Sequence, residues 1–265
     1  MRIALGVEYF GGAFEGWQIQ PHGRTVQDAL QAALTVIAQA PVEVVCAGRT
    51  DTGVHATSQV VHFDTTARRP LEAWVRGVNS HLPASVSVTW AVEVDEDFHA
   101  RFSAVARHYR YVLLNRRIRP AIQAGRVGWT HGTLDAERME RAARVLIGEH
   151  DFTSFRAAGC QAHSPVRTMY GAAVQRQGDY LLFDFHANAF LHHMIRNLVG
   201  ALIQVGKGRE PEDWLTHLLA VKDRRQAAPT FAPDGLYLCG VDYPAEKWPL
   251  PDGGRIIALP QLPLI

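Results

Sequence analysis

Residues 86–94 read Val-Ser-Val-Thr-Trp-Ala-Val-Glu-Val, and this stretch ends a series of strands and helices that forms the first half of the chain. Apolar side chains occupy every second position from Val86 to Val94, with polar or small residues between them. Successive side chains of a strand point to opposite faces of its sheet, so this alternation predicts a strand with one buried face.

Working outward from that strand toward the N-terminus, hydrophobic periodicity and turn residues predict five earlier elements. Thr25 and Asp28 have the spacing of a capping box, and Pro70 fits the first turn of a second helix. The elements are a strand over 2–9, a helix after Thr25, strands over 42–47 and 59–64, and a helix from Pro70 to about residue 79. The resulting order, β-α-β-β-α-β, is that of a ferredoxin-like unit.

The second half of the chain nearly repeats this order. It comprises a strand over 107–114, a helix from Thr133 to Ile147 that Gly148 closes, strands over 167–175 and 180–187, helices over 191–204 and 211–221, and a strand over 235–243. We therefore predict an α+β fold of two ferredoxin-like, or RRM-like, halves, whose antiparallel sheets join side by side with an active-site cleft between them. The expected divisions are residues 1–105, residues 106–245 and a C-terminal tail, 246–265.

Composition places the chain among ordinary globular proteins. The 265 residues are 47% hydrophobic and carry a formal net charge of +1, which disfavours disordered and membrane classes. We find no membrane span, signal peptide, Walker loop, GxGxxG, HExxH or GxSxG motif. Three distant cysteines indicate neither a disulfide framework nor a CxxC metal site, so a cytoplasmic location is expected.

The near-neutral total conceals an uneven distribution of charge. Only three of the 27 Lys and Arg residues are lysines, and residues 98–134 contain seven arginines and no acid. A GC-rich genome and the suitability of guanidinium groups for phosphate contacts both fit the preference for arginine. The acid-free stretch is suggestive of a polyanion-binding face.

The segment Gly48-Arg49-Thr50-Asp51-Thr52-Gly53-Val54-His55-Ala56 has the densest set of reactive side chains. Its two glycines allow a tight turn, and Asp51 stands at the tip. Arg49 would keep the Asp51 carboxylate ionised, as a nucleophile requires. The alternative is an Asx-type turn in which Asp51 only accepts backbone hydrogen bonds.

Six motifs closely resemble the tRNA pseudouridine synthase A family, in that family's order. They are Gly6–Tyr9 with Gly16-Trp17, Ala47–Phe63 (AGRTDTGVHATSQVVHF), Phe98–Tyr111 (FHARFSAVARHYRY), Glu149–Arg156 (EHDFTSFR), Asn188–Val199 (NAFLHHMIRNLV) and Gly235-Leu236-Tyr237. The resemblance implies an enzyme that converts uridine to pseudouridine at tRNA positions 38, 39 and 40 in the anticodon stem-loop. It also implies a homodimer without metal or other cofactor.

Site residues follow from the resemblance by position in its motifs. Asp51 would be the nucleophile, Arg196 would pair with it, and Tyr109 would stack on the target uracil. Arg49 would fill the space that the flipped nucleotide leaves. The implied tRNA contacts are Arg69, the segment Phe98, His99, Ala100, Arg101 and Phe102, and, less well matched in sequence, Gly159, Cys160, Gln161, Ala162 and His163.

Several of these residues also fit a purely structural role. Tyr109 also fits a strand tyrosine whose ring lies in the core. Arg156 and Arg167 are candidates for further RNA contacts, and for each arginine the alternative is a solvated surface position. Adjacent histidines on a helix point about 100° apart, so His192 and His193 are expected to line a cleft rather than bind one metal ion.

Two other functional classes compete with a uridine isomerase. A non-catalytic RRM-like RNA-binding module would need the basic face but not Asp51. A nucleoside hydrolase with an aspartate nucleophile would release free base. The products formed from unmodified tRNA distinguish the three classes.

Overall fold

The computed structural model describes residues 1–251, and the chain forms two compact units. Unit 1 consists of residues 1–107 together with the segment that begins at Tyr237, and unit 2 of residues 108–236. Strand β10 (Leu236–Asp242), which ends the second half in sequence, thus belongs almost wholly to unit 1. Of the predicted tail 246–265, residues 252–265 lie outside the described residues.

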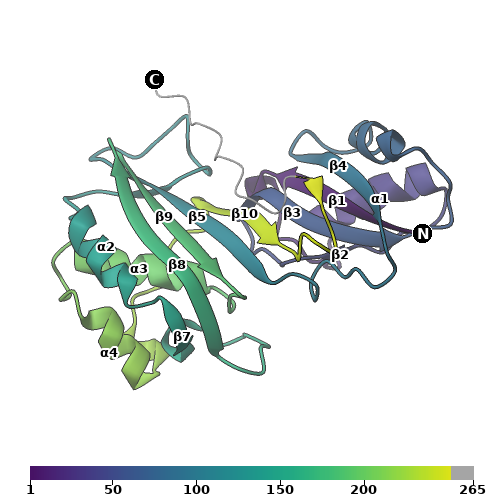
Figure 1. Cartoon of the computed structure of the whole chain (residues 1–265). Coiled ribbons are helices and arrows are strands. Elements are labelled where there is room, and N and C mark those ends of the chain that lie inside the picture. The colour runs from purple at the N-terminus through teal and green to yellow at the C-terminus, as the bar shows by residue number, and fades with distance from the viewer. Residues whose placement is uncertain (252–265) are drawn as a thin grey trace. The chain divides into compact units, whose positions relative to one another are not determined.

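Unit 1 has the strand order of a ferredoxin-like sheet. β1 lies between β4 and β3 in antiparallel pairing, β2 pairs with β3 antiparallel, and β10 pairs with the start of β3 in parallel (Figure 1). The elements are β1 (Arg2–Tyr9), η1 (Gly11–Ala13), α1 (Val26–Ala38), β2 (Val45–Cys46), β3 (His55–Asp64), the π-helical η2 (Ala73–Gly77) and β4 (Val86–Val94).

The local signals in unit 1 act as the sequence predicts. Thr25 accepts a hydrogen bond from the Asp28 backbone and Asp28 accepts one from the Thr25 backbone, which is the predicted capping box of α1. In β4, Val86 and Val88 are buried and Trp90 lies opposite Gly6 of β1. A Cβ atom at Gly6 would lie 2.1 Å from the Trp90 indole nitrogen, so the glycine makes room for that ring.

Unit 2 is a sheet in the order β5-β9-β8-β7, with β6 pairing with β5 in parallel. Helix α2 packs against β8 and α3, and α4 lies beside α2 and α3 (Figure 1). The elements are β5 (Ala106–Asn115), β6 (Gly128–Thr130), α2 (Ala136–Arg144), β7 (Gly148–Asp151), η3 (Thr153–Phe155), β8 (Val166–Gln177), β9 (Tyr180–Ala187), α3 (Met194–Gly206), α4 (Trp214–Val221) and η4 (Arg224–Gln226). The fold is thus α+β with mostly antiparallel sheets, and β5-β9-β8 follow the ferredoxin order.

Several predicted boundaries are wrong. Asp135, not Thr133, caps α2 by accepting from the Arg138 backbone, and Gly148 begins β7 instead of closing the helix. β3 starts at His55, so the second part of the predicted loop is already strand. The short strands β6 and β7 were not predicted because three or four residues carry too little periodicity. Within residues 1–251, no helix is long and apolar enough to cross a bilayer.

Candidate active site and RNA-binding loops

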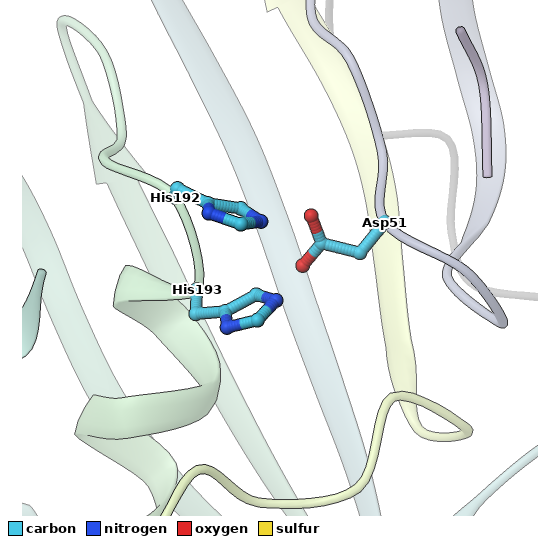
Figure 2. A group of neighbouring side chains, drawn as sticks. All are labelled: Asp51, His192 and His193. Atoms are coloured by element: carbon cyan, nitrogen blue, oxygen red, sulfur yellow. The ribbon is translucent and has the colours of Figure 1, made fainter. Parts of the chain in front are cut away.

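The segment between β2 and β3 presents Asp51 at its tip. The Val54 amide donates to the Asp51 backbone carbonyl at 3.1 Å, and Gly53 has a φ of 80°, so residues 51–54 form a turn. The Asp51 side chain is half-buried and projects from this loop (Figure 2). We call residues 48–54 the Asp51 loop.

Hydrogen bonds from buried residues hold the Asp51 loop in place. Tyr9 and Thr50 share a hydrogen bond of 2.8 Å between their hydroxyl groups, and the Trp17 amide donates to the Thr50 carbonyl at 3.0 Å. The buried Gln59 amide donates to the Gly48 carbonyl at 2.6 Å. Because a buried polar group left without a partner is costly, these contacts fix the loop in one conformation.

Two glycines let the chain approach this loop closely. A Cβ atom at Gly11 would lie 1.9 Å from the Val54 carbonyl oxygen. Gly16 has a φ of 88°, and a Cβ there would lie 3.0 Å from the Thr50 carbonyl oxygen. No other residue type fits at Gly11 without moving the Asp51 loop.

His55 is structural rather than exposed for chemistry. Its side chain is 1% exposed, and its Nδ1 accepts from the Gly11 amide at 2.9 Å. The ring stacks between Phe10 and Tyr237, with centroid distances of 5.1 and 4.6 Å. It therefore locks the end of the Asp51 loop to the strands of unit 1.

The predicted tRNA-contacting segment 98–102 divides into buried and exposed side chains. Phe98 and Ala100 are fully buried, whereas Arg101 is exposed and Phe102 is 75% exposed. The Phe102 ring stacks on His99 with centroids 4.3 Å apart, and the Arg101 guanidinium lies 5.4 Å from the Phe102 centroid. This 98–102 loop therefore offers a cation and an aromatic ring to solvent.

Histidines and a tyrosine anchor the backbone of the 98–102 loop. His62 Nδ1 accepts from the Ala100 amide at 3.1 Å, and the Tyr243 hydroxyl donates to the Ala100 carbonyl at 2.6 Å. His99 Nδ1 accepts from the amides of Arg101 and Phe102, both at 3.2 Å. An imidazole nitrogen accepts only when it carries no proton, so the loop requires both histidines to be neutral.

Burial and nearby cations favour that neutral state. Burial, followed by the charge of Arg2, lowers the pKa of His62 to about 4. The same two causes lower the pKa of His99 below its ordinary value. Both side chains can therefore serve as acceptors at neutral pH.

Arg107 joins the 98–102 loop to the start of the Asp51 loop. Its guanidinium donates to the carbonyls of Ala47 at 3.0 Å, Arg101 at 2.7 Å and Ala104 at 3.1 Å. Neither this role nor that of Gln59 was predicted from the sequence, although Arg107 stands two residues before Tyr109 in a quoted motif.

Arg49 and Arg69 are both exposed, and Arg69 donates to the Ile37 carbonyl.

In unit 2, Tyr109 and Arg196 lie on different elements. Tyr109 belongs to β5, is 9% exposed and packs edge-to-face with Phe190, 5.1 Å away between centroids. Arg196 lies in the first turn of α3, where its Nε donates to the Phe231 carbonyl at 2.8 Å. Both side chains thus have fixed positions within this unit.

The expectation that His192 and His193 lie on a helix is wrong. His193 is the residue before α3 and has a left-handed φ of 60°, so His192 belongs to the preceding segment. Their rings lie side by side with centroids 4.0 Å apart instead of diverging (Figure 2).

Arg156 organises the predicted tRNA-contacting segment 159–163. One of its terminal nitrogens donates to the carbonyls of Cys160 and Ala162, both at 2.7 Å. Gly159, Gln161 and His163 are exposed in the same turn. Burial raises the pKa of the Cys160 thiol, but hydrogen bonds from the Ala162 and His192 backbones and from Arg156 outweigh it and lower the pKa below its ordinary value.

Arg167 likewise serves its own segment. Its terminal nitrogen donates to the Ser164 carbonyl at 2.9 Å, and burial lowers the pKa of the side chain. Arg156 and Arg167 therefore hold backbone, a role that sequence patterns do not distinguish from RNA contact.

A family model and the similar sequences agree on one family. A family model described as tRNA pseudouridine synthase matches residues 5–103 and 142–244. The chain is similar to proteins named tRNA pseudouridine synthase A from Aromatoleum aromaticum (63% identity over 100% of both chains), Dechloromonas aromatica (61% over 95% of this chain and 96% of that one) and Thiobacillus denitrificans (58% over 94% and 99%). A solved Cbf5-Nop10-Gar1 complex matches 76% of this chain and 45% of that chain at a TM-score of 0.32 and 13% identity.

The match extends through both units and includes the Asp51 loop, the 98–102 loop and the first turn of α3. The chain belongs to the tRNA pseudouridine synthase family.

Proposed function

We propose that this protein isomerises uridine to pseudouridine at positions 38, 39 and 40 of the tRNA anticodon stem-loop. The observation that carries the proposal is full-length similarity to proteins named tRNA pseudouridine synthase A, combined with a rigidly backed loop that presents Asp51. The reaction breaks the C1′–N1 bond and forms a C1′–C5 bond, while N1 gains the proton that C5 loses. It conserves all atoms and electrons, so it requires no external oxidant, reductant or energy source.

In this proposal Asp51 is the nucleophile, and Arg196 pairs with its carboxylate and orders it. Support for Asp51 comes from its place at the tip of a turn. Trp17 and Gln59 hold the backbone of its loop, and Tyr9 holds the Thr50 side chain. A nucleophile held in this way loses little freedom when the substrate arrives.

Recognition of the RNA is assigned to the remaining site residues. Tyr109 stacks on the target uracil, and Arg49 occupies the space that the flipped nucleotide leaves. In the 98–102 loop, Arg101 and Phe102 contact the tRNA, while the buried Phe98 and Ala100 support them. Arg69 and the exposed residues of the 159–163 segment supply further contacts.

The test is the identity of the product from unmodified tRNA. The purified protein is incubated with a tRNA that has uridines at positions 38–40, and pseudouridine and free uracil are both quantified. Pseudouridine at those positions is expected. Free uracil would instead indicate a nucleoside hydrolase, and neither product, with tRNA still bound, would indicate an RNA-binding module.

The proposal includes a homodimer in the cytoplasm, because one 29.4 kDa chain offers a small footprint for a whole tRNA. Light scattering of the purified protein should give twice the mass of one chain. A monomer at working concentrations that still forms pseudouridine would remove the dimer from the proposal.

A further inference from the structure

A basic pocket in unit 2 contains none of the residues assigned to the proposed site. Strands β5 and β6 end beside it, and it has a volume of about 680 Å³. Its lining includes Arg116, Arg117, His131, Gly132, Leu134 and Arg176. We call this concavity the arginine pocket.

The arginine pocket contains positive charge without a carboxylate. Among residues 1–251, no acidic side chain forms an ion pair with Arg116, Arg117 or Arg176. Asp135 is near in sequence, but its carboxylate accepts from the Arg138 amide at the start of α2. Three arginines line one concavity, so their like charges repel one another, and an anion bound among them reduces that repulsion.

Other arginines of unit 2 show the contrast. Arg144 pairs with Glu140 and Arg225 with Asp223, and both arginines are exposed. Their charges are already compensated, so they attract an anion less strongly than the charges of the arginine pocket do.

The walls of the pocket are held in place by hydrogen bonds of their own. The Asn115 amide donates to the Gly132 carbonyl at 2.7 Å, and Arg176 donates to the Leu134 carbonyl at 2.9 Å and the Asn115 side chain at 3.1 Å. The Trp129 indole donates to the Arg116 carbonyl at 3.0 Å. The pocket therefore exists before a ligand binds, which reduces the entropic cost of binding.

We infer that the arginine pocket binds the phosphodiester backbone of tRNA, through residues other than those assigned to the target uridine. The inference rests on the proposed function, which makes tRNA the substrate. Guanidinium groups match phosphate oxygens with paired hydrogen bonds, and the exposed Arg117 has no acidic partner among the described residues. The volume exceeds one phosphate, and Leu134 with the arginine stems accommodates the adjoining ribose.

The test measures tRNA affinity against salt concentration with full-length protein carrying Asp51→Asn, which prevents turnover. The test variant adds Arg116→Gln and Arg117→Gln, and the matched control adds Arg144→Gln and Arg225→Gln, so both remove two positive charges from exposed positions of unit 2. Removing one arginine–phosphate interaction should reduce the slope of log affinity against log salt by about 0.7–0.9. The test variant should therefore have a shallower slope by about one to two units, and the control should keep the parent slope.

Arg117→Gln alone, which removes no hydrogen bond within the described residues, separates this effect from a folding defect and should reduce the slope by about one unit. Equal slopes for test variant and control would overturn the inference. A second outcome would also overturn it. If millimolar inorganic phosphate or uridine monophosphate raises the Tm of the parent but not of the test variant, and the salt slopes stay equal, the pocket binds small anions and not the tRNA backbone. The wild-type product assay reports separately on the proposed function, since a slope difference without pseudouridine formation would refute the isomerase and retain RNA binding here.

Discussion

At the scale of single residues, Arg107 connects two segments of unit 1. One planar guanidinium reaches three carbonyls on two segments, which a lysine ammonium on a flexible stem does not reproduce. Arg107 therefore links the backbone that precedes Asp51 to the backbone that carries Arg101.

Arg107→Lys should keep the charge and remove part of this network. We expect the free energy of unfolding to fall by about 2 kcal/mol, because carbonyls lose charged donors. Pseudouridine formation should fall further than stability alone explains, with kcat affected more than KM. Urea unfolding and steady-state kinetics measure the two effects, and Arg76→Lys, at an exposed arginine paired with Glu72, is the control. Unchanged kcat in a folded Arg107→Lys protein would contradict the positioning role.

His62 makes stability depend on pH in a defined window. Its pKa is about 4 in the folded protein against 6.5 unfolded, so the unfolded chain binds the extra proton between these values. Stability from this residue is therefore complete above pH 6.5 and falls by about 3 kcal/mol as the pH drops to 4. His62→Gln, whose carbonyl can still accept from the Ala100 amide, should flatten the stability curve over this range in urea unfolding. An equally steep curve in the variant would show that other groups cause the decrease.

At the scale of elements, the Asp51 loop depends on the segment that follows β1. Gly11→Ala would place a methyl group 1.9 Å from the Val54 carbonyl oxygen, a clash that only backbone movement relieves. We expect a decrease of about 3 kcal/mol in unfolding free energy, and a loss of activity larger than any loss of tRNA affinity. Gly171→Ala, where the new carbon meets its nearest neighbour at an ordinary 3.8 Å, should be mild in the same assays. Comparable activity for the two variants would exclude tight packing as the support of the loop.

The elements also show what sequence patterns can and cannot predict. The capping box at Thr25 and the alternation over 86–94 are local signals, and both predicted their elements correctly. Strand β3 extends back to His55, which pairs with Tyr237 of β10 and whose ring stacks between Phe10 and Tyr237; these are contacts between distant segments. The left-handed turn at His193 likewise has no local sequence signal, so a helix pattern extended over it.

In the candidate site, too, local sequence motifs are informative and contacts between distant residues are not predictable. Motif resemblance assigned roles to Asp51 and the 98–102 segment, which remain predictions, and it treated that segment as a uniform contact surface. Burial separates Phe98 and Ala100 from Arg101 and Phe102, and no one-dimensional pattern carries this information. Arg107 was missed because its partners lie up to 60 residues away in the chain.

At the scale of the whole molecule, the net charge of +1 is less informative than the pairing of its arginines. Arg141 and Arg144 of α2 are paired with Glu212 and Glu140, so they add little field for a polyanion. Arg116 and Arg117 have no such partner among the described residues. Near-neutral charge thus coexists with local positive charge that no described acid compensates, and a near-neutral total would limit indiscriminate binding of polyanions.

The most direct test of the proposed chemistry is pseudouridine formation by Asp51→Asn, which keeps the size of the side chain and removes its charge. We predict that this change lowers the rate by about a thousandfold or more while tRNA affinity stays within about threefold of wild type. Asp97→Asn, at an exposed carboxylate paired with Lys247, is the matched control and should react like wild type. Pseudouridine formed at the wild-type rate by folded Asp51→Asn protein would contradict the assignment of Asp51 as the nucleophile.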